Sequence, residues 1–259
     1  MTKAPTLSDE LLELAIKVAK NAGVLLMQRP QVFNLNEKSS IRDFATQMDH
    51  ESERLIVEQL LSARPEDGLI GEEGASRESK SGITWVIDPI DGTVNYFYGL
   101  PGWNISIAAK DSEGVLVGVV FAPTINSLWS AKRGGGAFLN QVKIQVNEPV
   151  ELEYALIATG FSYDHDQRIA QAVTMARLIP LVRDIRRNGA AAVDLCFVAM
   201  GALDGYFEAS LKEWDLAAGG LMVTEAGGMV TGRDGGSANS EMVIAAGPTL
   251  HAQLVLEIG

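Results

Sequence analysis

The sequence is poor in cysteine, in basic residues and in long apolar runs. Its one cysteine, Cys196, excludes an intramolecular disulfide and a thiolate-rich zinc site. With 21 Lys and Arg against 33 Asp and Glu, the formal net charge is −12, so the chain lacks the basic face that binds nucleic acid or an anionic membrane. No apolar run approaches the ~18 residues that span a bilayer. We therefore expect no nucleic-acid or membrane partner, and a cytoplasmic location.

Several catalytic motifs are also missing. The chain has no G-x-S-x-G elbow, no G-x-x-x-x-G-K-[ST] loop and no G-x-G-x-x-G after a strand. The three histidines, His50, His165 and His251, have no metal-ligand spacing, and we expect each to be a surface or capping residue. Cys196 lies in an apolar run and is expected to be an inert core residue. These absences disfavour the α/β-hydrolase type of catalysis, nucleotide binding through the familiar glycine-rich loops, and zinc chemistry.

Helical and strand patterns alternate along the chain. The first half predicts helices over 8–28, with Ser8 as N-cap, and 46–63, and strands over 83–88 (ended by Pro89), 104–110, 115–123 and 126–132. The second half predicts strands over 155–159, 181–186, 204–208 and 242–246, and helices over 166–179, 190–200, about 214–226 and 249–257. This alternation predicts a layered α/β architecture. Polar residues and a proline at 147–149 divide it into an N-terminal α+β half (1–148) and a C-terminal α/β half (149–259), with a site between them.

The most informative string is W-V-I-D-P-I-D-G-T-V-N-Y over residues 85–96. Pro89 allows the chain to turn, so Asp88 and Asp91 can come together after an apolar strand. Gly92 and Thr93 then open a predicted helix, whose free N–H groups suit a phosphate. Convergent carboxylate oxygens beside an anion site suit a hard cation such as Mg²⁺.

Each of these features also has a purely structural interpretation. Asp-Pro and Asp-Gly are common turn formers, and adjacent acids such as Glu72 and Glu73 are usually solvated. Asp49 and Asp215 stand where helices begin, so they could simply be capping residues. The segment 189–191 could approach a ligand closely or merely allow tight packing. Acid clusters at the ends of several predicted elements nevertheless favour a shared site.

Together with W-D-x-A-A-G over 214–219, the string W-x-I-D-P-I-D-G-T-x-N resembles the inositol monophosphatase family, within the lithium-sensitive, Mg²⁺-dependent phosphatase superfamily. The resemblance covers nearly the whole chain in the expected order. Its other parts are Lys38, Asp43, Thr46, Asp49, Gly71-Glu72-Glu73, Arg187, Gly189 to Ala192, Asp194, Glu208 and Glu225. It implies a layered α-β-α-β-α sandwich, commonly a homodimer, with two or three Mg²⁺ ions per site and inhibition by Li⁺.

The resemblance also implies roles by motif position. One Mg²⁺ would be held by Glu72, Asp88 and the Ile90 carbonyl, a second by Asp88, Asp91 and Asp215, and a third in part by Glu72. Asp49 and Thr93, with Glu72, would form the catalytic set that orients and activates the attacking water. The Gly92 and Thr93 N–H groups would hold the phosphate. The remaining substrate contacts would come from Lys38, Asp91, Gly189, Ala191, Glu208 and Asp215.

The chain departs from the family pattern at a few positions. Ile41 and Arg42 stand where the family often has Pro-Val, and this difference bears on the affinity for the third Mg²⁺ ion. Ala190 replaces the usual Ser or Thr and removes a hydroxyl contact, while Lys212 lies at a position that varies and leaves specificity open. The segment 189–192 lacks the aspartate of relatives that hydrolyse histidinol phosphate, which argues against that branch.

The leading hypothesis is Mg²⁺-dependent hydrolysis of myo-inositol 1-phosphate, or a related polyol monophosphate, by a metal-activated water. One alternative is the same chemistry on fructose 1,6-bisphosphate or a phosphoadenosine nucleotide. The other is a regulatory binding role without catalysis, against which the complete set of acids argues. The resemblance further predicts that Li⁺ inhibits uncompetitively.

Overall fold

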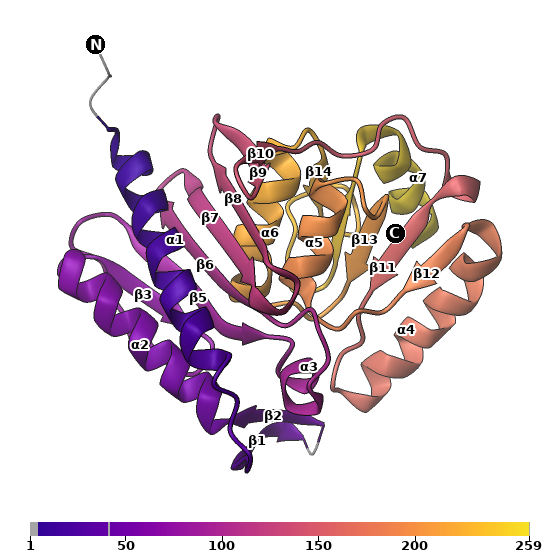
Figure 1. The fold of residues 1–259 in the computed structure, drawn as a ribbon. Coiled ribbons are helices and arrows are strands. Elements are labelled where there is room, and N and C mark those ends of the chain that lie inside the picture. Colours follow the sequence, from indigo (N-terminus) through magenta and orange to yellow (C-terminus); the bar gives the residue numbers. More distant parts are fainter. Residues whose placement is uncertain (1–4, 41, 259) are drawn as a thin grey trace.

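The computed structural model describes residues 5–40 and 42–258, and it forms five alternating layers of helices and sheets (Figure 1). Helices α1 (Leu7–Leu26) and α2 (Gln47–Ala63) cover the outer face of an eight-stranded sheet. Helices α5 (Ala191–Ala199) and α6 (Glu213–Glu225) fill the space between that sheet and a five-stranded one. The predicted layered α-β-α-β-α sandwich is therefore confirmed.

The larger sheet is antiparallel except where β3 pairs with β5. Its strands, in spatial order, are β10 (Val142–Lys143), β9 (Gly136–Leu139), β8 (Ser127–Lys132), β7 (Gly114–Ala122), β6 (Asn104–Asp111), β5 (Thr84–Asp91), β3 (Gly68–Gly71) and β4 (Ser76–Arg77). Side chains on β5 alternate between the two faces: Trp85 and Ile87 pack toward α1 and α2, and Val86 packs toward α5 and α6.

The smaller sheet belongs entirely to the second half. Its spatial order is β12 (Asp184–Arg186), β11 (Leu156–Thr159), β13 (Gly205–Glu208), β15 (Val243–Ala246) and β14 (Met229–Thr231). Strand β11 runs parallel to both of its neighbours, and the other pairs are antiparallel. The outer face of this sheet packs on residues from α4 (His165–Leu178) and α7 (Pro248–Ile258). Two short elements, α3 (Thr93–Tyr98) and the hairpin β1 (Leu35–Ser40) with β2 (Asp43–Thr46), lie at one end of the molecule.

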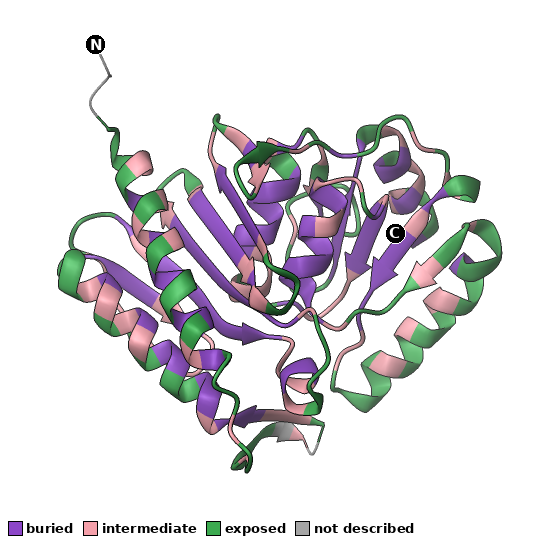
Figure 2. Ribbon diagram, viewed as in Figure 1, coloured by how far each residue is buried: buried purple, intermediate pink, exposed green. Residues whose placement is uncertain are grey.

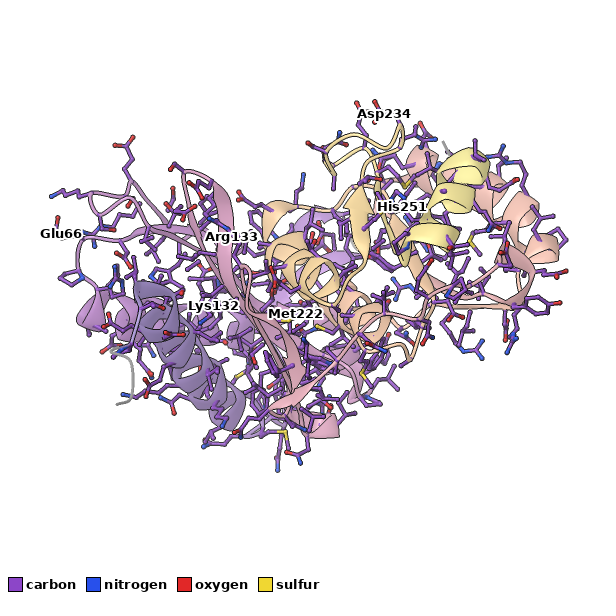
Figure 3. All side chains as sticks on the ribbon, turned by 90° about the horizontal axis from the view of Figure 1, so that it is seen from above. Glu66, Lys132, Arg133, Met222, Asp234 and His251 are labelled. Atoms are coloured by element: carbon purple, nitrogen blue, oxygen red, sulfur yellow. The ribbon has the colours of Figure 1, made fainter. Side chains whose placement is uncertain are left out.

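The central layer of helices, α5 and α6, packs against both sheets. Met222 on α6 is fully buried between them (Figure 3), and Figure 2 shows α5 and α6 far more buried than α4. Helix α6 lies very close to β7. A Cβ on Gly118 of β7 would be only 2.9 Å from the Cα of Ala218 on α6. The predicted boundary at 147–149 falls between the two sheets, but the core between the sheets draws residues from both halves. That the halves are separate domains stays a prediction.

The predicted helices and strands are found close to their expected bounds, with some corrections. Helix α1 is capped by Thr6 rather than Ser8, because Thr6 and Asp9 form a reciprocal capping box. Strand β5 does not end at Pro89 but runs on to Asp91, with a register shift against β6 over this stretch.

His251 is neither a surface nor a capping residue. It is buried and hydrogen bonded to the Thr231 hydroxyl at 2.8 Å. His50 and His165 are exposed and Cys196 is buried, as expected. Within residues 5–40 and 42–258, no helix has the length and apolar content needed to cross a bilayer.

Candidate active site

The Asp88–Asp91 segment lies at the end of β5, where the irregular pairing with β6 lets both carboxylates lie on one side. The Ile90 backbone N–H donates to Asp88 Oδ1 at 3.0 Å. Asp91 accepts from the Asn104 side-chain amide at 2.8 Å and from the backbone N–H groups of Ala191 and Ala192 at 3.1 and 2.8 Å. The first turn of α5 therefore holds a carboxylate of the first half.

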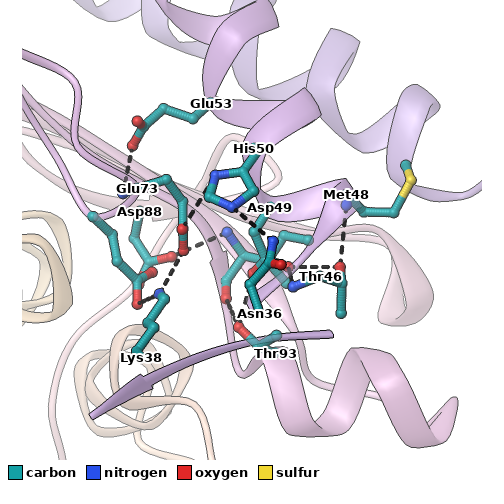
Figure 4. Close-up of polar contacts among 12 residues, drawn as sticks. Asn36, Lys38, Thr46, Met48, Asp49, His50, Glu53, Glu73, Asp88 and Thr93 are labelled. Carbon is teal, nitrogen blue, oxygen red and sulfur yellow. Dashed lines mark hydrogen bonds and ion pairs between the residues drawn. The ribbon is translucent and has the colours of Figure 1, made fainter. Parts of the chain in front are cut away.

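Asp49 lies behind Thr93. It is the third residue of α2, where its Oδ2 accepts from the Thr46 backbone N–H at 2.8 Å and from the Thr46 hydroxyl at 2.7 Å. Its other oxygen, Oδ1, accepts from the Thr93 hydroxyl at 2.9 Å (Figure 4). The capping interpretation of Asp49 is thus correct, yet the same carboxylate also orients Thr93.

The Glu72–Glu73 pair follows β3 and contacts Lys38 on β1. The Lys38 Nζ donates to Glu72 Oε1 at 2.8 Å and to Glu73 Oε1 at 2.5 Å. The Nδ1 atom of His50 lies 3.4 Å from Glu73 Oε2 (Figure 4). The two glutamates raise the pKa of Lys38, although burial of its ammonium acts in the opposite direction. The hairpin that carries Lys38 therefore lies against the carboxylate cluster.

Gly92 allows the turn from β5 into α3. Its φ of 86° is in the left-handed region, and a Cβ there would lie 3.1 Å from the Ala190 Cβ. The glycine is thus needed for its conformation and for the close approach of segment 189–191. This approach brings Gly189 and Ala191 to the same site as Thr93.

Glu208 and Asp194 form an acidic surface opposite β5. Tyr206 Oη donates to Glu208 Oε2 at 2.5 Å, and the Asn188 amide donates to Asp194 Oδ1 at 2.5 Å. Burial raises the pKa of each carboxyl to about 7. A Cβ on Gly160 would lie only 2.0 Å from Glu208 Oε2, so a larger residue there would displace this carboxylate.

These groups line one cleft of about 470 Å³. We call the side formed by residues of β1, β2, the loop after β3, β5 and the start of α3 the N-terminal wall. The side formed by residues 159–167, 187–194 and 208–215 is the C-terminal wall. The predicted site residues that line the cleft are Lys38, Glu72, Asp88, Ile90, Asp91, Gly92, Thr93, Gly189, Ala191, Glu208 and Asp215. Asp49 does not, because it is fully buried behind Thr93. The structure thus brings the whole predicted set together.

The electrostatics of the cleft show an excess of buried negative charge. Burial, followed by the charges of Glu72, Asp91 and Asp215, raises the pKa of Asp88 well above its usual range. Burial and the charge of Asp91 do the same to Asp215. Four carboxylates therefore repel one another in a poorly solvated space.

This donor set suits a hard divalent cation, because its oxygens are carboxylates and one backbone carbonyl. In the part of the chain that the structure describes, no three Asp, Glu, His or Cys side chains form a ready ligand cluster. Protein donors instead hold several of the oxygens, as Lys38 does for Glu72 and the Lys212 N–H does for Asp215 at 2.6 Å. A cation among these groups would relieve the repulsion that raises their pKa values.

Sequence reasoning missed several residues that shape the cleft. Asn104, which orients Asp91, begins a predicted strand, where a polar residue is typical of a turn. Tyr206 carries the hydrogen bond to Glu208 from within an apolar strand, where it resembles an ordinary core residue. Asn104 has no local signal, because its partner Asp91 lies on another strand. Tyr206 and Glu208 lie two residues apart on β13 and therefore share a face, a spacing that could have indicated their contact.

Comparison with known proteins agrees with this geometry. The chain matches the inositol monophosphatase family over residues 7–258. It is 41% identical to a Nus factor SuhB of Haemophilus influenzae, over 92% of this chain and 91% of that protein. It is 37% identical to an inositol-1-monophosphatase of Mycobacterium bovis, over 98% and 95% of the two chains.

Solved structures show the same fold. An extragenic suppressor protein suhB of Bartonella henselae superposes with a TM-score of 0.92 at 32% identity, covering 96% of this chain and 98% of that one. An IMPase of Thermotoga maritima gives a TM-score of 0.88 at 34% identity, covering 96% of each chain. The chain belongs to the inositol monophosphatase family and is a phosphoric monoester hydrolase.

Proposed function

We propose that the protein hydrolyses the phosphate monoester of a polyol, with myo-inositol 1-phosphate as the preferred substrate, in a Mg²⁺-dependent reaction. The observation that carries the proposal is the hydrogen bond from Thr93 to buried Asp49 beside the carboxylates of the N-terminal wall. Family members generally use Mg²⁺. The ligands here would be Glu72, Asp88, the Ile90 carbonyl, Asp91 and Asp215.

The Asp49–Thr93 pair would act on the attacking water. Because the Thr93 hydroxyl donates to Asp49, its lone pairs can accept a hydrogen bond from water. Burial raises the pKa of Asp49, which makes its carboxylate a stronger base for the proton that Thr93 passes on. When bound, Mg²⁺ would lower the pKa of that water and neutralise the charge of the phosphate and of the leaving oxygen.

The phosphate and the alcohol would contact different parts of the cleft. The N–H groups of Gly92 and Thr93 at the start of α3 would hold phosphate oxygens. Glu208 keeps one carboxylate oxygen for substrate hydroxyls, since Tyr206 occupies the other. An acidic alcohol side disfavours a second phosphate, so a neutral polyol fits better than fructose 1,6-bisphosphate.

A substrate panel tests this proposal. With Mg²⁺, we expect kcat/KM to be highest for myo-inositol 1-phosphate and lower for fructose 1,6-bisphosphate and a phosphoadenosine nucleotide. Removal of divalent ions with a chelator should abolish hydrolysis, and added Mg²⁺ should restore it. Equal rates on every monoester would overturn the inositol assignment, and full activity without divalent ions would overturn the metal requirement. Uncompetitive inhibition by Li⁺ is expected from the family resemblance.

The proposal includes a homodimer, as the family resemblance implies. Apolar residues on and after α4 are exposed, among them Ile169, Val173 and Ile179, and a second copy would cover part of this surface. Light scattering coupled to gel filtration tests this, with twice the mass of 27.8 kDa expected. A single-chain mass at micromolar concentration would contradict it.

A second candidate role is regulatory binding, because relatives at 41% and 38% identity are named Nus factor SuhB. The variant Asp91→Asn separates the two roles. If the cellular effect of the protein is lost together with hydrolysis, catalysis is the function. If the effect persists without hydrolysis, the binding role is supported.

A further inference from the structure

Glu53 is a buried acid that lies one helical turn beyond Asp49 on α2. Residues four apart share one face of a helix, so both carboxylates point from α2 toward the cleft region. Glu53 is 6% exposed and does not line the cleft. Its Oε2 accepts from the Glu73 backbone N–H at 2.9 Å (Figure 4), and its Oε1 accepts from the Ala75 backbone N–H, also at 2.9 Å.

The loop that Glu53 holds is the one that carries Glu72. It connects β3 to β4, and the Gly71 N–H closes it by donating to the Ala75 carbonyl at 2.7 Å. Gly71 also makes the approach possible, because a Cβ there would lie 2.3 Å from Glu53 Oε2. A carboxylate with two acceptor atoms therefore sits where two N–H groups of this turn converge.

We propose that Glu53 is a positioning residue that fixes the 72–75 loop so that Glu72 faces Asp88 across the cation site. This inference rests on the proposed function, since it assigns Glu72 to the cation. It also means that α2 sets two parts of the site at once, with Asp49 aligning Thr93 and Glu53 aligning Glu72. The chemistry requires a carboxylate: an amide in its place offers one acceptor and presents an N–H₂ group to the other N–H donor.

The chain offers a matched control in Glu225, at the end of α6. Its two oxygens accept from the backbone N–H groups of Gly134 and Gly136 at 2.7 and 2.8 Å. It therefore holds the turn between β8 and β9 as Glu53 holds the turn after β3, but that turn does not line the cleft. Losing either carboxylate removes the same kind of contact, and only one of the two is near the cation ligands.

The experiment compares Glu53→Gln, Glu53→Asp and Glu225→Gln with the wild type. Each protein is stripped of divalent ions, and its Mg²⁺ affinity is measured by titration calorimetry. We expect Glu53→Gln to weaken Mg²⁺ binding about 10- to 100-fold, as losing a residue that orients a ligand does. Glu53→Asp keeps both acceptors on a shorter side chain and should weaken it less. Glu225→Gln should bind Mg²⁺ like the wild type, while urea denaturation reports a similar loss of stability for both glutamine variants.

The outcomes separate this inference from the proposed function. Wild-type affinity in a folded Glu53→Gln protein overturns the inference and leaves the function intact. Equal weakening in Glu53→Gln and Glu225→Gln also overturns it, because the effect would then be general destabilisation. A wild type that does not bind Mg²⁺ overturns both. If Glu53→Gln does not fold, Glu53→Asp decides, and unchanged affinity in that variant overturns the inference.

Discussion

The two walls of the cleft differ in how firmly their side chains are held. On the N-terminal wall, Asp88 and Asp91 are 2% and 7% exposed, and the oxygens of Asp91 are engaged by N–H donors from β6 and α5. On the C-terminal wall, Tyr163 is 37% exposed and Lys212 is also exposed. Since Glu72, Asp88 and Asp91 lie on the N-terminal wall, most of the chemistry that is common to all phosphate monoesters fits this wall, with Asp215 added from the other. Discrimination between alcohols fits the C-terminal wall, which is more open to solvent.

The largest expected effect comes from breaking the N-terminal wall at Asp91. Asp91→Asn removes a proposed cation ligand and sets an amide N–H₂ against the N–H groups of Ala191 and Ala192. We expect kcat/KM to fall by at least about 10³-fold on every substrate. Steady-state kinetics measure it, with circular dichroism as the check on folding. A folded variant with more than about a tenth of wild-type activity would place the chemistry elsewhere.

A smaller loss should follow from removing the Thr93 hydroxyl. Thr93→Ala removes the hydroxyl that is hydrogen bonded to Asp49 and that we propose links it to the attacking water. We therefore expect kcat to fall about 10²- to 10³-fold with little change in KM. Thr93→Ser keeps a hydroxyl and should recover most of the rate. Equal activity in the alanine and serine variants would contradict the proton path through this residue.

A pH titration of stability compares the walls directly. The pKa values of Glu208 and Asp194 on the C-terminal wall are raised to about 7 by burial, from ordinary values of 4.5 and 3.8. Such groups stabilise the fold below their ordinary pKa, and that contribution is lost as the pH rises through about 7. For the metal-free protein we expect these two carboxyls to lower the free energy of unfolding by up to about 5 kcal/mol between about pH 5 and pH 8.

Saturating Mg²⁺ and the substitution Glu208→Gln separate the contributions of the two walls to this pH-dependent loss of stability. Burial also raises the pKa of Asp88 and Asp91 on the N-terminal wall, so saturating Mg²⁺ should remove their share of the loss. Glu208→Gln should remove a share that Mg²⁺ leaves in place. Urea denaturation across the pH range measures both, and a constant free energy of unfolding in the metal-free wild type would contradict the raised pKa values.

The smallest effect should be selective rather than general. Glu208→Gln replaces the carboxylate that we propose accepts hydrogen bonds from substrate hydroxyls, so we expect kcat/KM for myo-inositol 1-phosphate to fall about tenfold. An aryl phosphate without hydroxyl groups should be hydrolysed at the wild-type rate. A parallel loss on both substrates would show that the two walls do not divide chemistry from selectivity.

Local signals in the sequence predicted most of the layers and the pairing of Asp88 with Asp91, while the roles of Asp49, Glu208 and Asp215 came from the family resemblance. Apolar periodicity marks α1, α2 and the β6–β7 hairpin, and Asp88 and Asp91 stand three residues apart in one string. Pro89 misled the prediction of β5, since a missing N–H is harmless where the strand pairing is already irregular. Strands β1 and β2 were not predicted, because residues 35–46 are largely polar and show no alternation of apolar and polar residues.

Long-range contacts account for the rest. Glu53 is typical of an acid on the solvent face of a helix, and its partners are backbone N–H groups about 20 residues away, which no side-chain pattern reveals. His251 was expected at the surface, but Thr231 on the neighbouring strand β14 gives it a buried partner. Thr6 and Ser8 are both good N-caps, and only the reciprocal bond with Asp9 decides between them.

The bonds from the first turn of α5 to Asp91 have a consequence for folding. Strand β5 and α5 come from different halves of the chain, so the geometry of this carboxylate exists only once the halves have docked. A ligand that requires that geometry binds the docked state and stabilises it in proportion to its concentration. Substitutions outside the cleft that loosen the docking, such as Gly118→Ala on β7 against Ala218 on α6, should therefore lower ion affinity without touching a ligand. Ion affinity thus reports on the assembly of the whole molecule.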